Sequence, residues 1–167
     1  MCATKLQYIV ASGIAIMAPN FFRRLFEAGG DPPVIDVQSA DAEMNAAIAR
    51  ARGTLATFWA SYDAPYSSED GHCLKVQFAD ASNEVEHIWM AEVKETAPGR
   101  YSGRFANDPR HLPGKHAGDV TEFREADITD WMFLRNEKIV GAETMRPLLK
   151  SLPKPDADAL RARLETP

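Results

Sequence analysis

Residues 73–94 read CLKVQFAD, then ASN, then EVEHIWMAEVK, and they indicate the fold class most directly. In the first segment the apolar residues Leu74, Val76 and Phe78 alternate with polar ones, a pattern that predicts a half-buried strand. The middle three residues favour a turn, and the last segment alternates again over a longer stretch. Two strands joined by so short a turn pair antiparallel, because a parallel crossover needs a dozen or more residues.

The chain after this hairpin repeats the same pattern. Turn signals at 97–99 and 136–137 separate further strand candidates, which are 100–106, 119–124, 128–135 and 138–142. The short connections between the first three strands, up to residue 106, predict an antiparallel meander, and 128–135 is expected to pair with 138–142. We expect an α+β fold in which an N-terminal amphipathic helix packs on a curved antiparallel sheet or small barrel of about five to six strands, with C-terminal helices.

The segment before the hairpin has the periodicity of a helix from about Ala42 to Tyr62, which Ser39 or Asp41 would cap. Its apolar residues recur at spacings of four and three and so form one stripe: Met44, Ile48, Ala51, Leu55, Phe58 and Tyr62. We expect this stripe to be core, since the e and g charges of a coiled coil are missing. After the sheet, 144–152 and 156–165 are expected to be helical.

The length of 167 residues, with 45% hydrophobic and 26% charged residues, fits one hydrophobic core. We place a single α+β domain at 34–152. Residues 1–33 form an extension with a short helix and a linker, and 153–167 form a helical tail. The short helix is indicated by an apolar stripe from Phe21 to Phe26 that stops before Gly29 and Gly30.

An apolar run from Leu6 to Ala18 resembles the core of an export signal. It is shorter than the roughly 20 residues that a membrane span needs, so we expect no span. Only one basic residue precedes it, which favours a cytoplasmic protein over an exported one. Translation from Met17 is a further alternative, in which residues 1–16 would lie outside the native protein.

The formal net charge of -5 weighs against nucleic-acid binding, because proteins that bind the phosphate backbone usually carry a basic surplus. The two cysteines, Cys2 and Cys73, are too few for a disulfide framework or a paired-cysteine metal site. We expect Cys73 to be a small half-buried residue. A nucleophilic role would need a base, and the sequence indicates only the adjacent His72.

Two short stretches set a polar group beside a tryptophan, and they are Glu86-His87-Ile88-Trp89 and Asp130-Trp131-Met132-Phe133. Strand alternation places Glu86 and His87 on opposite faces, so they are not expected to act together as acid and base. His87 is either a histidine hydrogen-bonded within the fold, or a general base or ligand. The two tryptophans are either core residues or platforms on which a planar ligand stacks.

Asp130 lies in an apolar strand, where an unpaired carboxylate would be costly. It either holds the sheet together through hydrogen bonds or lines a pocket with His87 and Asn107. The candidate ligand-binding residues are therefore His87, Trp89, Asn107, Asp130 and Trp131.

Residues 107–118 form a twelve-residue loop, long enough to indicate a functional feature. It carries a local positive cluster, the candidate interaction residues Arg110, His111, Lys115 and His116. Such a cluster suits an acidic partner or a phosphate, with solvated loop charge as the alternative. The histidine spacing does not fit a helical metal clamp, and the common nucleotide-binding and hydrolase motifs are missing, so neither a metal nor a cofactor is predicted.

The chain resembles the bacterial domain of unknown function 2314 family (YegJ-like). The matching stretches are Asp41–Asn45, Glu86–Trp89, Gly103, Asn107–Pro109, Gly118–Val120, Ile128–Met132 and Gly141. They cover about residues 34–149, and the order of the two tryptophan stretches is fairly specific. The resemblance implies a bacterial, intracellular domain with these limits, and it carries no activity that can be transferred.

Two classes of function follow from these observations. The first is a noncatalytic binding or interaction domain, whose sheet face and 107–118 loop recognise a protein or a small ligand. The alternative is an enzyme, for example a hydrolase, with a site around His87, Asn107 and Asp130. An enzyme predicts that these three side chains line one solvent-open pocket.

Overall fold

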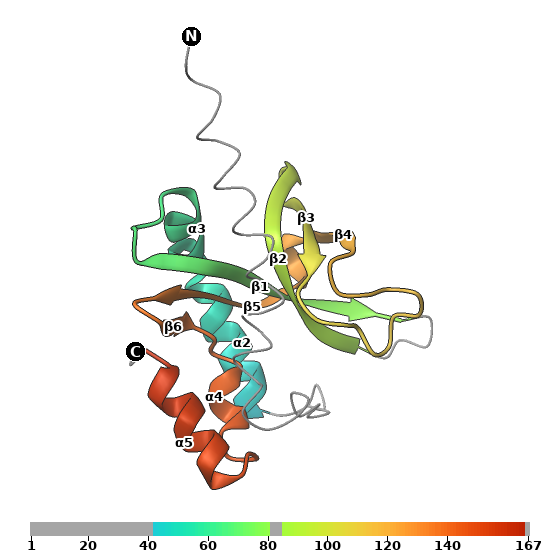
Figure 1. Ribbon diagram of the computed structural model, residues 1–167. Coiled ribbons are helices and arrows are strands. Elements are labelled where there is room, and N and C mark those ends of the chain that lie inside the picture. Colours follow the sequence, from blue (N-terminus) through green and yellow to red (C-terminus); the bar gives the residue numbers. More distant parts are fainter. Residues whose placement is uncertain (1–41, 81–84, 166–167) are drawn as a thin grey trace.

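The computed structural model describes residues 42–80 and 85–165 of the chain (Figure 1). The predicted short helix near residue 21, the export-like run, the caps Ser39 and Asp41 and the turn at 81–83 lie outside the described residues. Within the described ranges, no helix is long and apolar enough to cross a membrane.

The described strands form one open, six-stranded antiparallel sheet. In chain order they are β1 (Glu69–Ala79), β2 (Val85–Ala97), β3 (Arg100–Phe105), β4 (Val120–Arg124), β5 (Ile128–Arg135) and β6 (Lys138–Gly141). Across the sheet their order is β4-β3-β2-β1-β5-β6. This confirms the predicted α+β fold, in the form of an open sheet rather than a closed barrel.

The meander predicted for the first three strands is confirmed and continues to β4, whereas β5 returns to pair with β1, a pairing that the sequence did not predict (Figure 1). The reason lies in burial. Residues 128–133 are all buried, so both faces of this part of β5 are covered, as in an inner strand. In β4 only Phe123 is buried, which suits a strand at the edge of a sheet.

The predicted helix over 42–62 is two helices, α2 (Ala42–Gly53) and α3 (Leu55–Asp63). The break falls at Thr54, whose hydroxyl donates to the carbonyl oxygens of Arg50 and Ala51 at 3.0 and 3.2 Å. A threonine that bonds its local backbone in this way competes with the regular helix, and the preceding glycine is also a weak helix former. The predicted apolar stripe is nevertheless largely buried or half-buried, with Ala47 added to it.

Two helices follow the sheet, as predicted, and they are α4 (Met145–Leu148) and α5 (Lys154–Arg163). Their bounds differ from the predicted ranges 144–152 and 156–165. The break between them coincides with Pro153, which precedes the first residue of α5. Beyond α5, the Glu165 backbone N–H donates to the Ile139 carbonyl at 2.8 Å. This contact fixes the end of the tail against β6.

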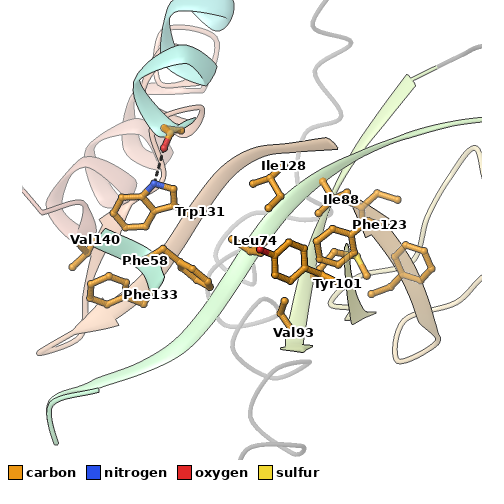
Figure 2. Packing of buried hydrophobic residues seen from close by; sticks show 14 residues of the cluster. Phe58, Leu74, Ile88, Val93, Tyr101, Phe123, Ile128, Trp131, Phe133 and Val140 are labelled. Atoms are coloured by element: carbon orange, nitrogen blue, oxygen red, sulfur yellow. Dashed lines mark hydrogen bonds between the residues drawn. The ribbon is translucent and has the colours of Figure 1, made fainter. Parts of the chain in front are cut away.

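The sheet separates two hydrophobic cores. The first lies between the sheet and helices α2 and α3 and includes Phe58, Leu74, Ile88, Trp131 and Phe133 (Figure 2). The second involves α4 and the end of the tail and includes Cys73, Trp89, Met132, Ile139, Met145 and Leu164. Consecutive residues of one strand therefore serve different cores, as the alternation in the sequence predicts.

Gly141, at the end of β6, has less room for a side chain than any other glycine in the described part of the chain. Its φ is +79°, and a Cβ added there would lie 2.5 Å from the Trp131 carbonyl oxygen and 2.7 Å from two atoms of the indole ring. The next residue, Ala142, also has a positive φ of 53° and donates its N–H to the same carbonyl at 2.8 Å. Only glycine fits this turn without displacing Trp131.

Replacing Gly141 with alanine should lower the free energy of unfolding by roughly 2–5 kcal/mol, because a left-handed backbone and an overpacked core are penalised together. Urea denaturation measures this change. Gly99→Ala is the matched control, because its φ is +69° but no atom lies within 4 Å of the added Cβ. It should lose only about 1 kcal/mol. Equal losses in the two variants would show that the contact with Trp131 contributes nothing.

Candidate functional site

The first tryptophan stretch divides its side chains between the two faces of β2. Ile88 belongs to the first core and Trp89 to the second. Glu86 contacts the 107–118 loop, whereas His87 contacts Thr129 of β5. Glu86 and His87 thus have separate partners, and they form no acid and base pair.

The Glu86 carboxylate holds the 107–118 loop through the backbone. The Arg110 N–H lies 3.0 Å from both carboxylate oxygens, and the His111 N–H donates to Oε2 at 2.9 Å. Two consecutive N–H groups that converge on one carboxylate make an anion-binding nest, here filled by the protein itself. Leu112 also packs against the first core. The middle of the loop is therefore fastened to the sheet.

The second half of the loop is held by two aspartates. Asp108 Oδ1 accepts the Ala117 N–H at 2.8 Å, and Asp119 Oδ2 accepts the His116 N–H at 2.9 Å. The candidate interaction residues of the loop are all exposed: Arg110, His111, Lys115 and His116. The backbone is thus fixed while the basic side chains face solvent.

Asp130 is completely buried, on the face of the sheet that carries the second core. Its Oδ1 accepts the N–H groups of Trp131 and Glu143 at 2.8 and 3.2 Å. Its Oδ2 accepts the N–H and the hydroxyl of Thr144 at 2.7 and 2.6 Å. Burial raises the pKa of this carboxyl, against the hydrogen bonds from Thr144 and the charge of Lys75. Its oxygens are occupied inside the protein, so they are not offered to a substrate.

Lys75 of β1 joins this network, although nothing in the sequence pattern distinguishes it from other lysines. It stands opposite both Trp89 and Asp130 in the strand register. Its Nζ donates to the Thr144 hydroxyl at 3.1 Å and lies 5.5 Å from the centre of the Trp89 ring, a cation–π distance. Burial lowers the pKa of Lys75, and the charge of Asp130 opposes this. Only the strand register, which periodicity alone does not supply, would have identified this lysine.

His87 lies on the same face as Lys75 and remains exposed. Its Nδ1 is 3.0 Å from the Thr129 hydroxyl oxygen, which is also 3.3 Å from the Lys75 carbonyl oxygen. Desolvation by its neighbours and the positive charges of Lys75 and Arg52 lower the pKa of His87. The imidazole is therefore neutral at pH 7 and sits in a positive field.

The remaining two ligand-binding candidates lie elsewhere. Trp131 points into the first core, where its Nε1 donates to the Ala51 carbonyl at 2.9 Å, beside the break between α2 and α3 (Figure 2). The Asn107 side chain donates to the Asp108 carbonyl at 3.3 Å. The structure thus brings His87, Trp89 and Asp130 onto one face of the sheet, whereas Trp131 enters the core on the opposite face.

A second polar cluster, which the sequence did not indicate, joins α3 to β1 and β5. Ser61 Oγ lies 2.8 Å from Glu69 Oε2 and 2.8 Å from His72 Nε2. Glu69 also accepts a hydrogen bond from Arg135 at 2.8 Å. Burial raises the pKa of Glu69, but the hydrogen bonds from Ser61 and Arg135 outweigh it and hold the pKa below its usual value.

This cluster contains the parts of a serine triad in an order that does not activate the serine. Because Glu69 is ionised, Ser61 donates its proton to the carboxylate and must accept one from His72. A catalytic histidine instead accepts the serine proton. The His72 ring is also stacked on Phe133, with centroids 5.1 Å apart. The arrangement is that of a structural link.

Two further chemical possibilities can be judged from the geometry. Cys73 is buried, and burial raises the pKa of its thiol to about 12, so the thiolate that a nucleophile requires does not form near neutral pH. In the described part of the chain, no three His, Cys, Asp or Glu side chains are grouped so that they would hold a metal ion.

Comparison with known proteins gives a family and two relatives. The family model described as an uncharacterized protein conserved in bacteria (DUF2314) matches residues 41–162. The chain is 36% identical over 95 residues to the uncharacterized protein YegJ of Escherichia coli, a match that covers 57% of this chain and 61% of the relative. It is 29% identical over 126 residues to a putative ankyrin repeat protein of Neisseria meningitidis, which covers 71% of this chain and 49% of the relative. It therefore spans about half to three fifths of these relatives. No solved structure matches significantly.

Replacing Asp130 with asparagine should lower the free energy of unfolding by about 3–5 kcal/mol, because it leaves a half-buried lysine without its counter-charge and removes an acceptor from Thr144. Chemical denaturation of Asp130→Asn, Lys75→Met and the double variant measures the coupling between the two groups. The double variant should lose less than the sum of the single losses, by roughly 0.5–3 kcal/mol. Additive losses would mean that Lys75 and Asp130 do not stabilise each other.

Proposed function

This chain belongs to the family of uncharacterized proteins conserved in bacteria (DUF2314), and we propose that it is a noncatalytic binding domain that contacts a protein partner through the 107–118 loop. The observation that carries the proposal is the contrast between the two parts of this loop. Its backbone is fastened by carboxylates, while its basic side chains are exposed.

Fastening the backbone favours binding because less conformational entropy is lost when a partner docks. Side chains such as Arg110 and Lys115 then offer positive charge from a fixed position. In the described residues neither of them forms an ion pair within the protein. An acidic surface on the partner is the chemistry that complements them.

The chemical groups on the sheet support binding over catalysis. Asp130 has its oxygens occupied, Cys73 is buried, and Ser61 donates its proton to a carboxylate. The Neisseria meningitidis relative, a putative ankyrin repeat protein, is about twice as long as the region matched. A region that forms one half of a longer protein is consistent with a module that works through contacts with other protein surfaces.

Changing Arg110 and Lys115 to serine should reduce the capture of partner proteins from the source bacterium at least about tenfold, which corresponds to roughly 1.4 kcal/mol of lost binding free energy. Quantitative mass spectrometry of captured proteins measures the change. The matched control changes Lys94 and Arg100, which are also exposed and carry the same charge. It should retain the partners. Identical lists for the wild type and the loop variant would remove the loop from the proposal.

Glu86→Gln distinguishes the effect of a fixed loop backbone on partner binding from the effect of the loop's positive charge. The substitution removes one negative charge beside the loop, so charge alone predicts tighter binding to an acidic partner. It also weakens the hydrogen bonds that hold Arg110 and His111, so loss of order predicts weaker binding. We expect binding to weaken, with dissociation measured by biolayer interferometry on a partner identified by capture. Tighter binding would show that the fixed backbone is not required.

A further inference from the structure

The end of the described chain pairs with the outer edge of β6, which is the last strand of the sheet (Figure 1). Leu164 forms a parallel bridge with Ile139, and the Glu165 N–H donates to the Ile139 carbonyl oxygen at 2.8 Å. The Leu164 side chain is buried in the second core. Sheets bind extended peptides in the same way, with backbone hydrogen bonds along an edge strand and side chains buried beside it. The tail therefore occupies the β6 edge as a bound peptide would.

Basic side chains gather around the docked segment. Arg135 Nη1 lies 3.6 Å from Glu165 Oε2, and Arg146 Nη2 donates to the Glu165 carbonyl oxygen at 3.0 Å. Lys138 Nζ donates to a backbone carbonyl oxygen one turn earlier in the tail. Two of these three cations also pair with internal carboxylates, and the pairs are Arg135 with Glu69 and Arg146 with Glu143. The docked segment supplies a third carboxylate, so the charges of the site favour an acidic residue.

The helix that carries this segment contributes little to its attachment. In α5, Ala157 is the one buried residue. Asp158 pairs with two basic residues of the same helix, and these ion pairs do not join α5 to the sheet. Leu160 is half-buried against the second core. The attachment of the tail therefore depends largely on its last residues, 162–165.

Undocking of the tail would uncover apolar surface and backbone together. Ile139 is fully buried, and it belongs to the same core as Leu164 and Met145. Its carbonyl oxygen would also lose the hydrogen bond from Glu165. An edge strand that exposes backbone groups and apolar side chains pairs readily with another extended chain. The β6 edge thus requires an occupant, and the tail shows which chemistry fits, an apolar residue followed by an acidic one.

We propose that the outer edge of β6, together with Arg135 and Arg146, binds an extended segment of another protein in which an apolar residue is followed by an acidic one. The apolar residue takes the place of Leu164 and the acidic one that of Glu165, with the segment parallel to β6. The chain's own tail occupies the site until such a segment displaces it. β6 and β4 form opposite edges of the sheet, and the 107–118 loop leads into β4, so this surface is separate from that of the proposed function.

A segment of another protein fits this site better than the tail of a second copy. A second copy would make the same contacts, but without the tether that keeps the chain's own tail at a high effective concentration near β6. The tail also leaves room for improvement. The 3.6 Å between Arg135 and the Glu165 carboxylate exceeds the roughly 2.8 Å of a charge-assisted hydrogen bond, and Arg146 meets a neutral carbonyl oxygen of the tail. A carboxylate that reaches either arginine directly would bind more tightly than the tail does.

A synthetic peptide that repeats residues 160–165, with blocked ends, tests the site in the full chain. Leu164→Ser with Glu165→Gln should release the tail, and this release variant should bind the peptide at least about tenfold more tightly than the wild type, whose own tail competes. Fluorescence anisotropy measures the binding. Asp158→Asn with Ala159→Ser is the matched control, because it makes the same change in charge at exposed residues of α5. It should bind as weakly as the wild type. Glu165→Arg alone should show intermediate binding, and it tests the site even if the release variant unfolds.

Selection from a random peptide library on the release variant identifies the preferred chemistry. The selected peptides should carry an apolar residue followed directly by an acidic one. They should also displace the tail of the wild type, seen as at least about tenfold faster hydrogen exchange of the Glu165 amide. The proposal is overturned if the tail peptide binds neither variant more tightly than the wild type, or if the selected peptides lack this pair of residues. A wild type that dimerises while the release variant stays monomeric would assign the site to a second copy and would equally overturn it.

Discussion

The Asp130 carboxylate joins three segments that are far apart in the chain. It accepts hydrogen bonds from its own strand and from the turn after β6, and through Thr144 it reaches Lys75 on β1. A buried carboxylate is costly unless every oxygen is satisfied, so the turn must form in one conformation. That turn has positive φ values at Gly141 and Ala142. The hydrogen bonds that Asp130 accepts from Glu143 and Thr144 thus hold the turn between the end of β6 and the start of α4.

In each of the two tryptophan stretches, consecutive side chains make contacts on opposite faces of the sheet. In the first, one residue fastens the loop, the next contacts β5, and the two that follow enter different cores. In the second, Asp130 accepts hydrogen bonds from the turn, while Trp131 donates to the Ala51 carbonyl, which also accepts from Thr54 at the break between α2 and α3. Such positions are constrained by the fold whether or not a ligand binds.

Much of the fold could be predicted from the sequence because periodicity determines which face a side chain occupies. The strands, the apolar stripe of the first helix and the separation of Glu86 from His87 all follow from it. Pairing between distant strands does not, so the position of β5 beside β1 was missed. The site depends on that pairing, because Lys75 meets Asp130 only across these two strands. The break at Thr54 was missed for a different reason, since a single side chain outweighs a regular apolar pattern there.

The division of the interior into two cores has a practical consequence for observing the molecule. The chain has three tryptophans, and the cores do not share them equally. Trp59 and Trp131 pack on the side of α2 and α3, where Trp59 stacks on Tyr101 with centroids 5.1 Å apart. Trp89 alone belongs to the other side. Tryptophan fluorescence therefore reports on the two cores separately. Variants that keep a single tryptophan would reveal whether the two cores unfold in one cooperative transition.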